Sequence, residues 1–169
     1  MNKQVALDDV ISVIMEKLDS GGTVTFTPNG TSMEPMLRDG KDVVVLKKKQ
    51  GRLKLYDVAL YLRDNGQYVL HRVIDYCNDG SYVMCGDNQF AREKGIRDDQ
   101  ILAVMTAFYR KGKPYTTGSI RYRVYITFWY HSRIFRHAYR SGKRRTMKLF
   151  GITPKPKSEK KKKKKDDYY

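Results

Sequence analysis

The chain has 169 residues, of which 40% are hydrophobic and 12% aromatic, a composition that suits one globular domain with its own core. Residues 1–109 carry 14 Lys and Arg against 15 Asp and Glu, whereas residues 110–169 carry 20 against 3, so the formal net charge of +16 arises in the C-terminal third. This distribution excludes a uniformly basic nucleic-acid-binding domain and predicts a near-neutral body with a cationic extension.

The first predicted element is an amphipathic helix within residues 1–22. In LDDVISVIMEKLDSGG the apolar side chains recur at helical spacing, with aspartates before them as a cap and glycines after them as a stop. The N-terminus has no apolar run, so no signal peptide is predicted, and no stretch reaches the roughly 20 apolar residues of a membrane-spanning helix. We therefore expect the protein in the cytoplasm or at the periphery of the cytoplasmic membrane.

Residues 23–113 are predicted to form a β-rich domain. Short β-branched and aromatic runs alternate with turn residues, and these runs are TVTFT, DVVVL, YDVALYLR, YVLHRVIDY, SYVMCGD and ILAVMTAFYR. The Asn-Gly at residues 65–66 and the Asp-Gly at residues 79–80 are typical of tight hairpin turns. The sequence therefore predicts a mainly antiparallel β-fold with a short helix before it.

Two cysteines, Cys77 and Cys85, flank the second predicted turn at unequal distances. If that turn pairs Cys77 with a residue near Ser81, Cys85 lies too far along the next strand to reach it, so both are predicted to be reduced thiols packed as small apolar groups. No second Cys or His pair stands at metal-ligand spacing, so neither a metal nor another cofactor is expected.

Residues 114–150 are predicted to form a basic, aromatic helical segment, and residues 151–169, with an unbroken lysine run, a disordered tail. In the helical segment aromatic side chains recur at helical steps, with arginines at the opposite positions. Two interpretations stay open: the aromatic face lies in a membrane interface, or it covers an apolar edge of the β-domain. Through residues 121–165 we expect contact with an anionic membrane surface, with nucleic acid as the less favoured partner.

Ser32 follows the first predicted strand. A serine hydroxyl is a poor nucleophile unless it has an adjacent base, a group that orients the base and donors for the developing oxyanion. Most serines in loops have no such neighbours, and Ser32 by itself indicates only a turn. Four ordered segments give it a context, and these are GTSMEPMLRDGKDVVVL, YDVALYLR, YVLHRVI and CGDN.

In this order the four segments resemble the conserved boxes of the signal peptidase and LexA-like serine protease superfamily, from about residue 30 to residue 110. The resemblance implies the antiparallel β-fold of that family and a serine endopeptidase with Ser32 as nucleophile. LHRVI is similar to the box of the histidine-base branch, found in endoplasmic-reticulum, archaeal and sporulation-type signal peptidases, which makes His71 the implied base. Imidazole titrates near neutrality and suits that role, whereas the alternative, Lys54, lies in a polar stretch where desolvation is hard to arrange.

The group that orients His71 has two candidates. CGDNQFAREKGI resembles the Gly-Asp-Asn box of the family and an acidic position a few residues later, and the matching residues are Asp87 and Glu93. Histidine-type relatives carry aspartate at the second position, where this chain has glutamate. Asp87 is the first candidate and Glu93 the second, the alternative for Glu93 being a surface ion pair with Lys94 or Arg97.

The resemblance also implies the oxyanion donors and part of the substrate groove. The backbone N–H of Ser32 and the Thr31 hydroxyl are the expected oxyanion donors, and Met33 and Pro35 are expected at the substrate. The implied reaction is cleavage of a precursor or signal peptide after small residues through an acyl-enzyme, with the peptide extended along a sheet edge. The alternative is a non-catalytic, protease-like module attached to a membrane or to nucleic acid by its basic C-terminus.

Overall fold

The computed structural model describes residues 3–132, 135–136, 138–139, 142 and 146. The chain divides into two units, Met1–Thr127 and Phe128–Tyr169. The first unit holds the β-sheet together with the N-terminal helix and the start of the second helix.

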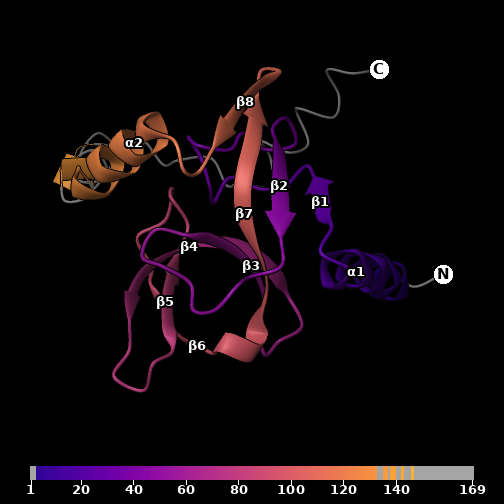
Figure 1. Cartoon of the computed structure of the whole chain (residues 1–169). Helices are drawn as coiled ribbons and strands as arrows, with labels where there is room; N and C mark the ends of the chain where they lie inside the picture. The colour runs from indigo at the N-terminus through magenta and orange to yellow at the C-terminus, as the bar shows by residue number, and fades with distance from the viewer. Residues whose placement is uncertain (1–2, 133–134, 137, 140–141, 143–145, 147–169) are drawn as a thin grey trace. The chain divides into compact units, whose positions relative to one another are not determined.

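The first unit is built on an eight-stranded antiparallel sheet (Figure 1). Its elements are α1 (Lys3–Asp19), β1 (Thr23–Phe26), β2 (Val43–Lys47), β3 (Val58–Leu62), β4 (Tyr68–Tyr76), β5 (Tyr82–Cys85), β6 (Glu93–Ile96), a 3-10 turn η1 (Asp98–Gln100), β7 (Ile101–Arg110), β8 (Lys113–Thr116) and α2 (Ile120–His131). The strand order is β1-β2-β7-β3-β4-β5-β6, and β8 pairs with the end of β7. The mainly antiparallel β-fold predicted from the sequence is confirmed.

Both predicted hairpins are present. The Asn-Gly turn joins β3 to β4, with the backbone N–H of Arg63 donating to the carbonyl of Gln67, and the Asp-Gly turn joins β4 to β5, with the N–H of Cys77 donating to the carbonyl of Ser81. Cys77 is half-buried, Cys85 is buried, and neither of the two is in a disulfide, as the sequence predicted.

Two strands were not predicted from the sequence, namely β6 and β8. β8 folds back on β7 through a turn at Lys111 and Gly112, both of which have positive φ. The sheet therefore extends past residue 113, where the sequence placed the boundary between the β-domain and the helical segment.

Side chains from outside the sheet complete the larger of two buried clusters. Leu18 comes from α1, Met36 and Leu37 come from the loop between β1 and β2, and Tyr122 and Ile126 come from α2. The second cluster lies around β3, β4 and β5 and consists of Leu53, Ala59, Tyr61, Val73, Tyr82, Met84, Ile96 and Ile101. The loop that carries Ser32 is thus anchored in the core.

Some residues of the aromatic face predicted for the C-terminal segment are partly buried, and others are exposed. Tyr125 packs against the larger cluster, whereas Phe128, Phe135 and Tyr139 are exposed. In the second unit the guanidinium of Arg136 lies 3.5 Å from the centroid of the Trp129 ring. The predicted disordered tail lies outside the described residues, and within them neither helix combines the length and the apolarity that crossing a bilayer demands.

Candidate functional site

Ser32 is half-buried on the loop between β1 and β2, and its neighbours fix that loop. Met33 and Met36 are 4% and 2% exposed and hold the loop against the core on the C-terminal side of the serine. Arg110, at the end of β7, donates from Nη1 to the carbonyls of Pro35 and Met36. The short MEPM stretch therefore presents Ser32 on a loop that core packing and main-chain hydrogen bonds hold in place.

A second loop, which follows β5, binds the serine loop directly. The backbone N–H of Asn88 donates to the carbonyl of Ser32 at 2.8 Å, and the Asn88 side-chain amide donates to the carbonyl of Thr31 at 3.0 Å. Asn88 belongs to the CGDN segment, so that segment holds the backbone around Ser32 in place through two hydrogen bonds.

Gly86 marks the point at which Ser32 and His71 meet. A Cβ added at Gly86 would lie 3.1 Å from the Cβ of Ser32 and 3.1 Å from Nε2 of His71, so these two atoms lie within twice that distance of each other. The same Cβ would lie only 2.6 Å from the Ser32 carbonyl oxygen, closer than real Cβ atoms approach. The absence of a side chain at Gly86 thus lets the serine loop and the imidazole approach each other.

His71 lies in β4 and is 3% exposed. On the side opposite Nε2, its Nδ1 lies 3.2 Å from the hydroxyl of Tyr61, a fully buried residue of β3. The Tyr61 hydroxyl donates to Oε2 of Glu93 at 2.9 Å. A hydrogen-bonded chain therefore leads from the carboxylate of Glu93 through a phenol to the imidazole.

Arg63 binds Glu93, the carboxylate at the end of this series of hydrogen bonds. Its Nε donates to Oε1 of Glu93 at 2.7 Å and its Nη2 donates to Oε2. Burial acts to raise the pKa of Glu93, but hydrogen bonds from Arg63 and Tyr61 outweigh burial and hold the pKa below its ordinary value. Glu93 is therefore an ionised carboxylate near neutral pH, and the ion pair it forms is with Arg63.

Burial is the main cause of a low pKa at His71. Together with the positive charge of Arg63, it lowers the pKa of His71 to about 4, while the charges of Glu93 and Asp87 act in the opposite direction. The imidazole is accordingly neutral at pH 7, the state in which a histidine accepts a proton.

Asp87, the first candidate for orienting His71, is buried and forms a bidentate ion pair. Nε and Nη2 of Arg72 donate to its two carboxylate oxygens, each at 2.7 Å. Nη1 of Arg72 also donates to the hydroxyl of Tyr122 in α2 at 3.0 Å. Asp87 thus acts on His71 through its charge, and its role as the orienting group stays a prediction beside the hydrogen-bonded path from Glu93.

A hollow of about 870 Å³ lies beside Ser32 and His71, and both residues line it. Its apolar wall includes Ile11 and Ile14 of α1, and its polar rim includes Arg63. Further lining residues are Phe26, Pro28, Met33, Leu60, Asn65, Gln67 and Leu70. Of the two residues expected at the substrate, Met33 lines the hollow, whereas Pro35 is exposed with its carbonyl bound by Arg110.

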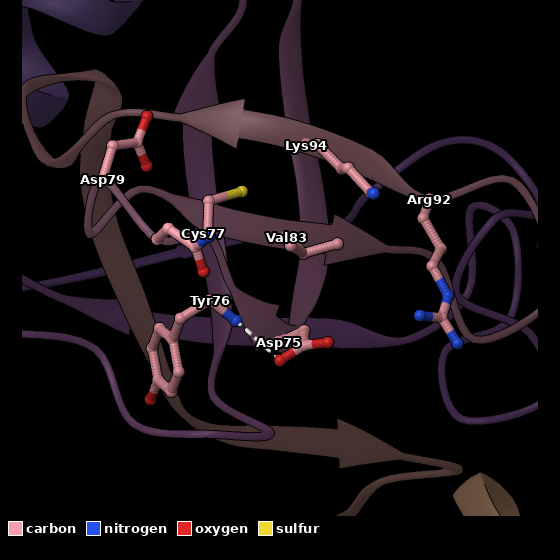
Figure 2. Close-up of a pocket in the computed structure, with 8 residues that line it drawn as sticks. Asp75, Tyr76, Cys77, Asp79, Val83, Arg92 and Lys94 are labelled. Carbon is pink, nitrogen blue, oxygen red and sulfur yellow. Dashed lines mark hydrogen bonds between the residues drawn. The ribbon is translucent and has the colours of Figure 1, made fainter.

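A second hollow, of about 460 Å³, lies at the β4–β5 hairpin and β6. Figure 2 shows its basic side chains, Arg92 and Lys94, on the side away from Asp79. The Asp79 carboxylate already accepts hydrogen bonds from the backbone N–H and the hydroxyl of Ser81. This hollow contains none of the predicted catalytic residues, and its charges are mixed, so the first hollow is the better candidate site.

Sequence reasoning missed four residues of the site, which are Tyr61, Arg63, Gly86 and Asn88. Tyr61 and Arg63 lie in YDVALYLR, and Gly86 and Asn88 lie in CGDN, so their segments were identified without their roles. Within the part of the chain that the structure describes, no three His, Cys, Asp or Glu side chains gather as a metal site would require.

Comparison with family models, curated proteins and solved structures found no match to this chain.

Proposed function

We propose that this protein is a serine endopeptidase of the signal-peptidase type, in its histidine-base branch, that cleaves a precursor or signal peptide after small residues. The proposal rests on one observation: Ser32 Cβ and His71 Nε2 both lie 3.1 Å from the position that a Cβ at Gly86 would occupy. A hollow open to substrate adjoins both side chains. The four motif segments of the sequence support the assignment to this family.

In the proposed reaction the hydroxyl oxygen of Ser32 attacks the scissile carbonyl carbon while His71 Nε2 accepts the hydroxyl proton. The tetrahedral intermediate collapses, the C–N bond breaks, and the imidazolium returns the proton to the leaving amine. Water then attacks the acyl-enzyme with the same imidazole as base and releases the carboxylate. We assign the backbone N–H of Ser32 and the hydroxyl of Thr31 to the oxyanion, as the resemblance implies.

The proposed substrate is an extended peptide that adds a strand at the β1 end of the sheet. Among the described strands β1 terminates the sheet order, and Phe26, at its end, lines the hollow together with Thr27 and Pro28. Main-chain hydrogen bonds to such an edge provide affinity without selecting side chains. The preference for small residues at the cut comes from the resemblance.

Purified wild-type protein and a Ser32→Ala variant, assayed on peptides with an Ala-x-Ala site, test the proposal. We expect cleavage by the wild type and none by the variant. An acylating probe should add its mass to Ser32 of the wild type and leave Ser32→Ala unmodified. Equal turnover by the two proteins, or no acylation of Ser32, would favour the alternative, a protease-like binding module without catalysis.

We also propose an anionic membrane surface as a partner of the C-terminal segment. Ile120, Val124 and Phe128 recur every four residues along α2 and are 80%, 63% and 71% exposed. Residues 110–169 supply the cations that would contact lipid phosphates. Each Lys or Arg near such a surface contributes about 1 kcal/mol of binding.

A further inference from the structure

The position of Tyr61 follows from the pairing of β3 with β4. In that pairing Ala59 lies opposite His71, and Tyr61 lies opposite Val69. Tyr61 is two residues from Ala59, so it shares the face of Ala59 and is the diagonal neighbour of His71 across the two strands. A long side chain at this position reaches the imidazole, and the two ring centroids lie 6.2 Å apart.

The single proton of the Tyr61 hydroxyl determines the direction of the hydrogen bonds around it. Glu93 is ionised and can only accept, so the 2.9 Å contact is a charge-assisted bond in which Tyr61 donates. At the 3.2 Å contact with His71 the phenol oxygen has no proton left and must accept. The proton of the neutral imidazole therefore lies on Nδ1.

This tautomer leaves the lone pair of Nε2 on the side of Gly86 and Ser32. Unconstrained imidazole in water prefers the opposite tautomer, with the proton on Nε2, which cannot accept a proton from serine. The charged groups near the imidazole are Arg63, directly after β3, Glu93 of β6 and Asp87 of the loop after β5. Of these, Glu93 accepts the proton of the Tyr61 hydroxyl, and the Arg63 guanidinium, a donor only, is also hydrogen-bonded to the oxygen of that hydroxyl.

We propose that Tyr61 is a positioning residue that, held by Glu93, fixes His71 in the Nδ1–H tautomer. This path joins the carboxylate to the base through a phenol, so the glutamate in place of the family's aspartate contacts the histidine through an intermediate side chain. The role in catalysis rests on the proposed function, but the tautomer does not, because the hydrogen bonds define it in the resting protein.

The direct test is ¹⁵N NMR of the full-length protein, with the His71 signals assigned by their loss in His71→Gln. We expect the protonated-nitrogen shift at Nδ1 in the wild type. Tyr61→Phe should move the equilibrium toward Nε2–H. In Glu93→Ala, Tyr61 keeps its hydroxyl but loses its acceptor, so it can donate to Nδ1 and should invert the tautomer. Thus, if Tyr61→Phe fails to fold, Glu93→Ala still decides.

Tyr82→Phe is the matched control. Tyr82 is also a buried tyrosine, and its hydroxyl donates to Asp98 at 2.6 Å. This variant should leave the His71 tautomer unchanged. A wild type with the proton on Nε2, or a tautomer that neither Tyr61→Phe nor Glu93→Ala alters, would overturn the proposal.

Kinetics separate the two proposals. Tyr61→Phe should lower kcat by about 10²-fold with little change in KM, the size of a general-base contribution, and Tyr82→Phe should lower neither. If the wild type cleaves no peptide yet shows the Nδ1–H tautomer that the two variants remove, the proposed function fails and the positioning by Tyr61 stands. If cleavage is intact in Tyr61→Phe, the role in catalysis fails and the proposed function stands.

Discussion

At the scale of single residues, Gly86 makes the strongest demand on side-chain identity. The atom closest to a Cβ at this position would be a backbone oxygen, that of Ser32, which cannot rotate away as a flexible side chain would. A methyl group there would push the serine loop away from the end of β5, or push the imidazole away from Ser32. The requirement is for space rather than for an unusual backbone angle.

We predict that Gly86→Ala folds and loses activity. Because the added methyl separates the serine from the imidazole, kcat should fall by about 10²-fold, the cost of a displacement near 1 Å. Gly118→Ala is the control, since a Cβ at Gly118 meets nothing within 4 Å. Wild-type turnover by Gly86→Ala would show that Ser32 and His71 need not meet at this point.

The buried imidazole predicts an unusual acid limb in the rate profile. Burial, assisted by Arg63, lowers the pKa of His71 to about 4, so the imidazole stays neutral at pH values where an exposed histidine is protonated. We expect kcat/KM to stay level from pH 7 to about 5, below the ordinary histidine pKa of about 6.5. Arg63→Gln should shift the limb to higher pH, because it removes a positive charge near the ring. A wild-type limb centred near pH 6.5 would contradict a lowered pKa of His71 as the origin of the limb.

Folding stability should respond to the same group. The folded-state pKa of His71 lies below the unfolded one, so the unfolded chain binds the extra proton between about pH 6.5 and pH 4. The contribution of neutral His71 is present above pH 6.5 and is lost as the pH falls toward 4. Denaturant unfolding at pH 7 and pH 4.5 should show a smaller loss in His71→Gln than in the wild type.

At the scale of elements, the ion pair between Arg72 and Asp87 ties β4 to the loop after β5. Both side chains are 3% exposed. The same loop carries Gly86 and Asn88, which contact the serine loop. This pair therefore fixes the loop that contacts the serine loop, whatever Asp87 contributes to the orientation of His71.

Removal of one partner of this pair should be costly. Asp87→Asn leaves the Arg72 charge buried without its counterion, and we expect a loss of about 3–5 kcal/mol in the free energy of unfolding. The double variant Arg72→Met, Asp87→Leu should recover most of that loss. If the double variant also recovers peptide cleavage, Asp87 acts through structure; if it folds and remains inactive, Asp87 is needed at His71.

The sequence predicted the elements whose signals are local. The β3–β4 and β4–β5 hairpins follow from β-branched runs joined by Asn-Gly and Asp-Gly. The strand β6, with the sequence EKGI, has few apolar residues, and β8, with the sequence KPYT, contains a proline, so neither carries a strand pattern. Both form because a neighbouring strand offers an edge to pair with.

The residues of the candidate site likewise include some with a local sequence signal and others that depend on tertiary packing. Ser32 and His71 were predicted from short segments, and the structure brings them together at Gly86. The path from Glu93 through Tyr61 could not be predicted, because four of the five residues of β3 are buried and no alternation indicates which of them face His71. Arg72 as the partner of Asp87 also depends on the packing of strands that are distant in sequence.

At the scale of the whole molecule, charge is separated along the chain. Residues 1–109 are near neutral, whereas residues 110–169 contain 20 Lys and Arg against 3 Asp and Glu. The exposed apolar residues of α2 come at the start of that segment. This combination suits an anionic surface better than a neutral one.

We predict that the full chain sediments with phosphatidylglycerol vesicles and not with phosphatidylcholine vesicles, and that binding weakens as salt is raised. Val124→Asp should reduce binding, because it places a negative charge on the exposed face of α2. Val13→Asp is the control, since Val13 is an equally exposed apolar residue of α1. Sedimentation that ignores lipid charge, or equal losses in the two variants, would exclude α2 as the contact.

The hydrogen bond from Arg72 to the Tyr122 hydroxyl bears on where the chain can be shortened. A fragment ending at residue 113, where the composition changes, would lack β8 after its first residue, the phenol that Arg72 contacts, and the buried side chain of Ile126. The smallest fragment that folds by itself must therefore run beyond Ile126, into the first turns of the cationic helix.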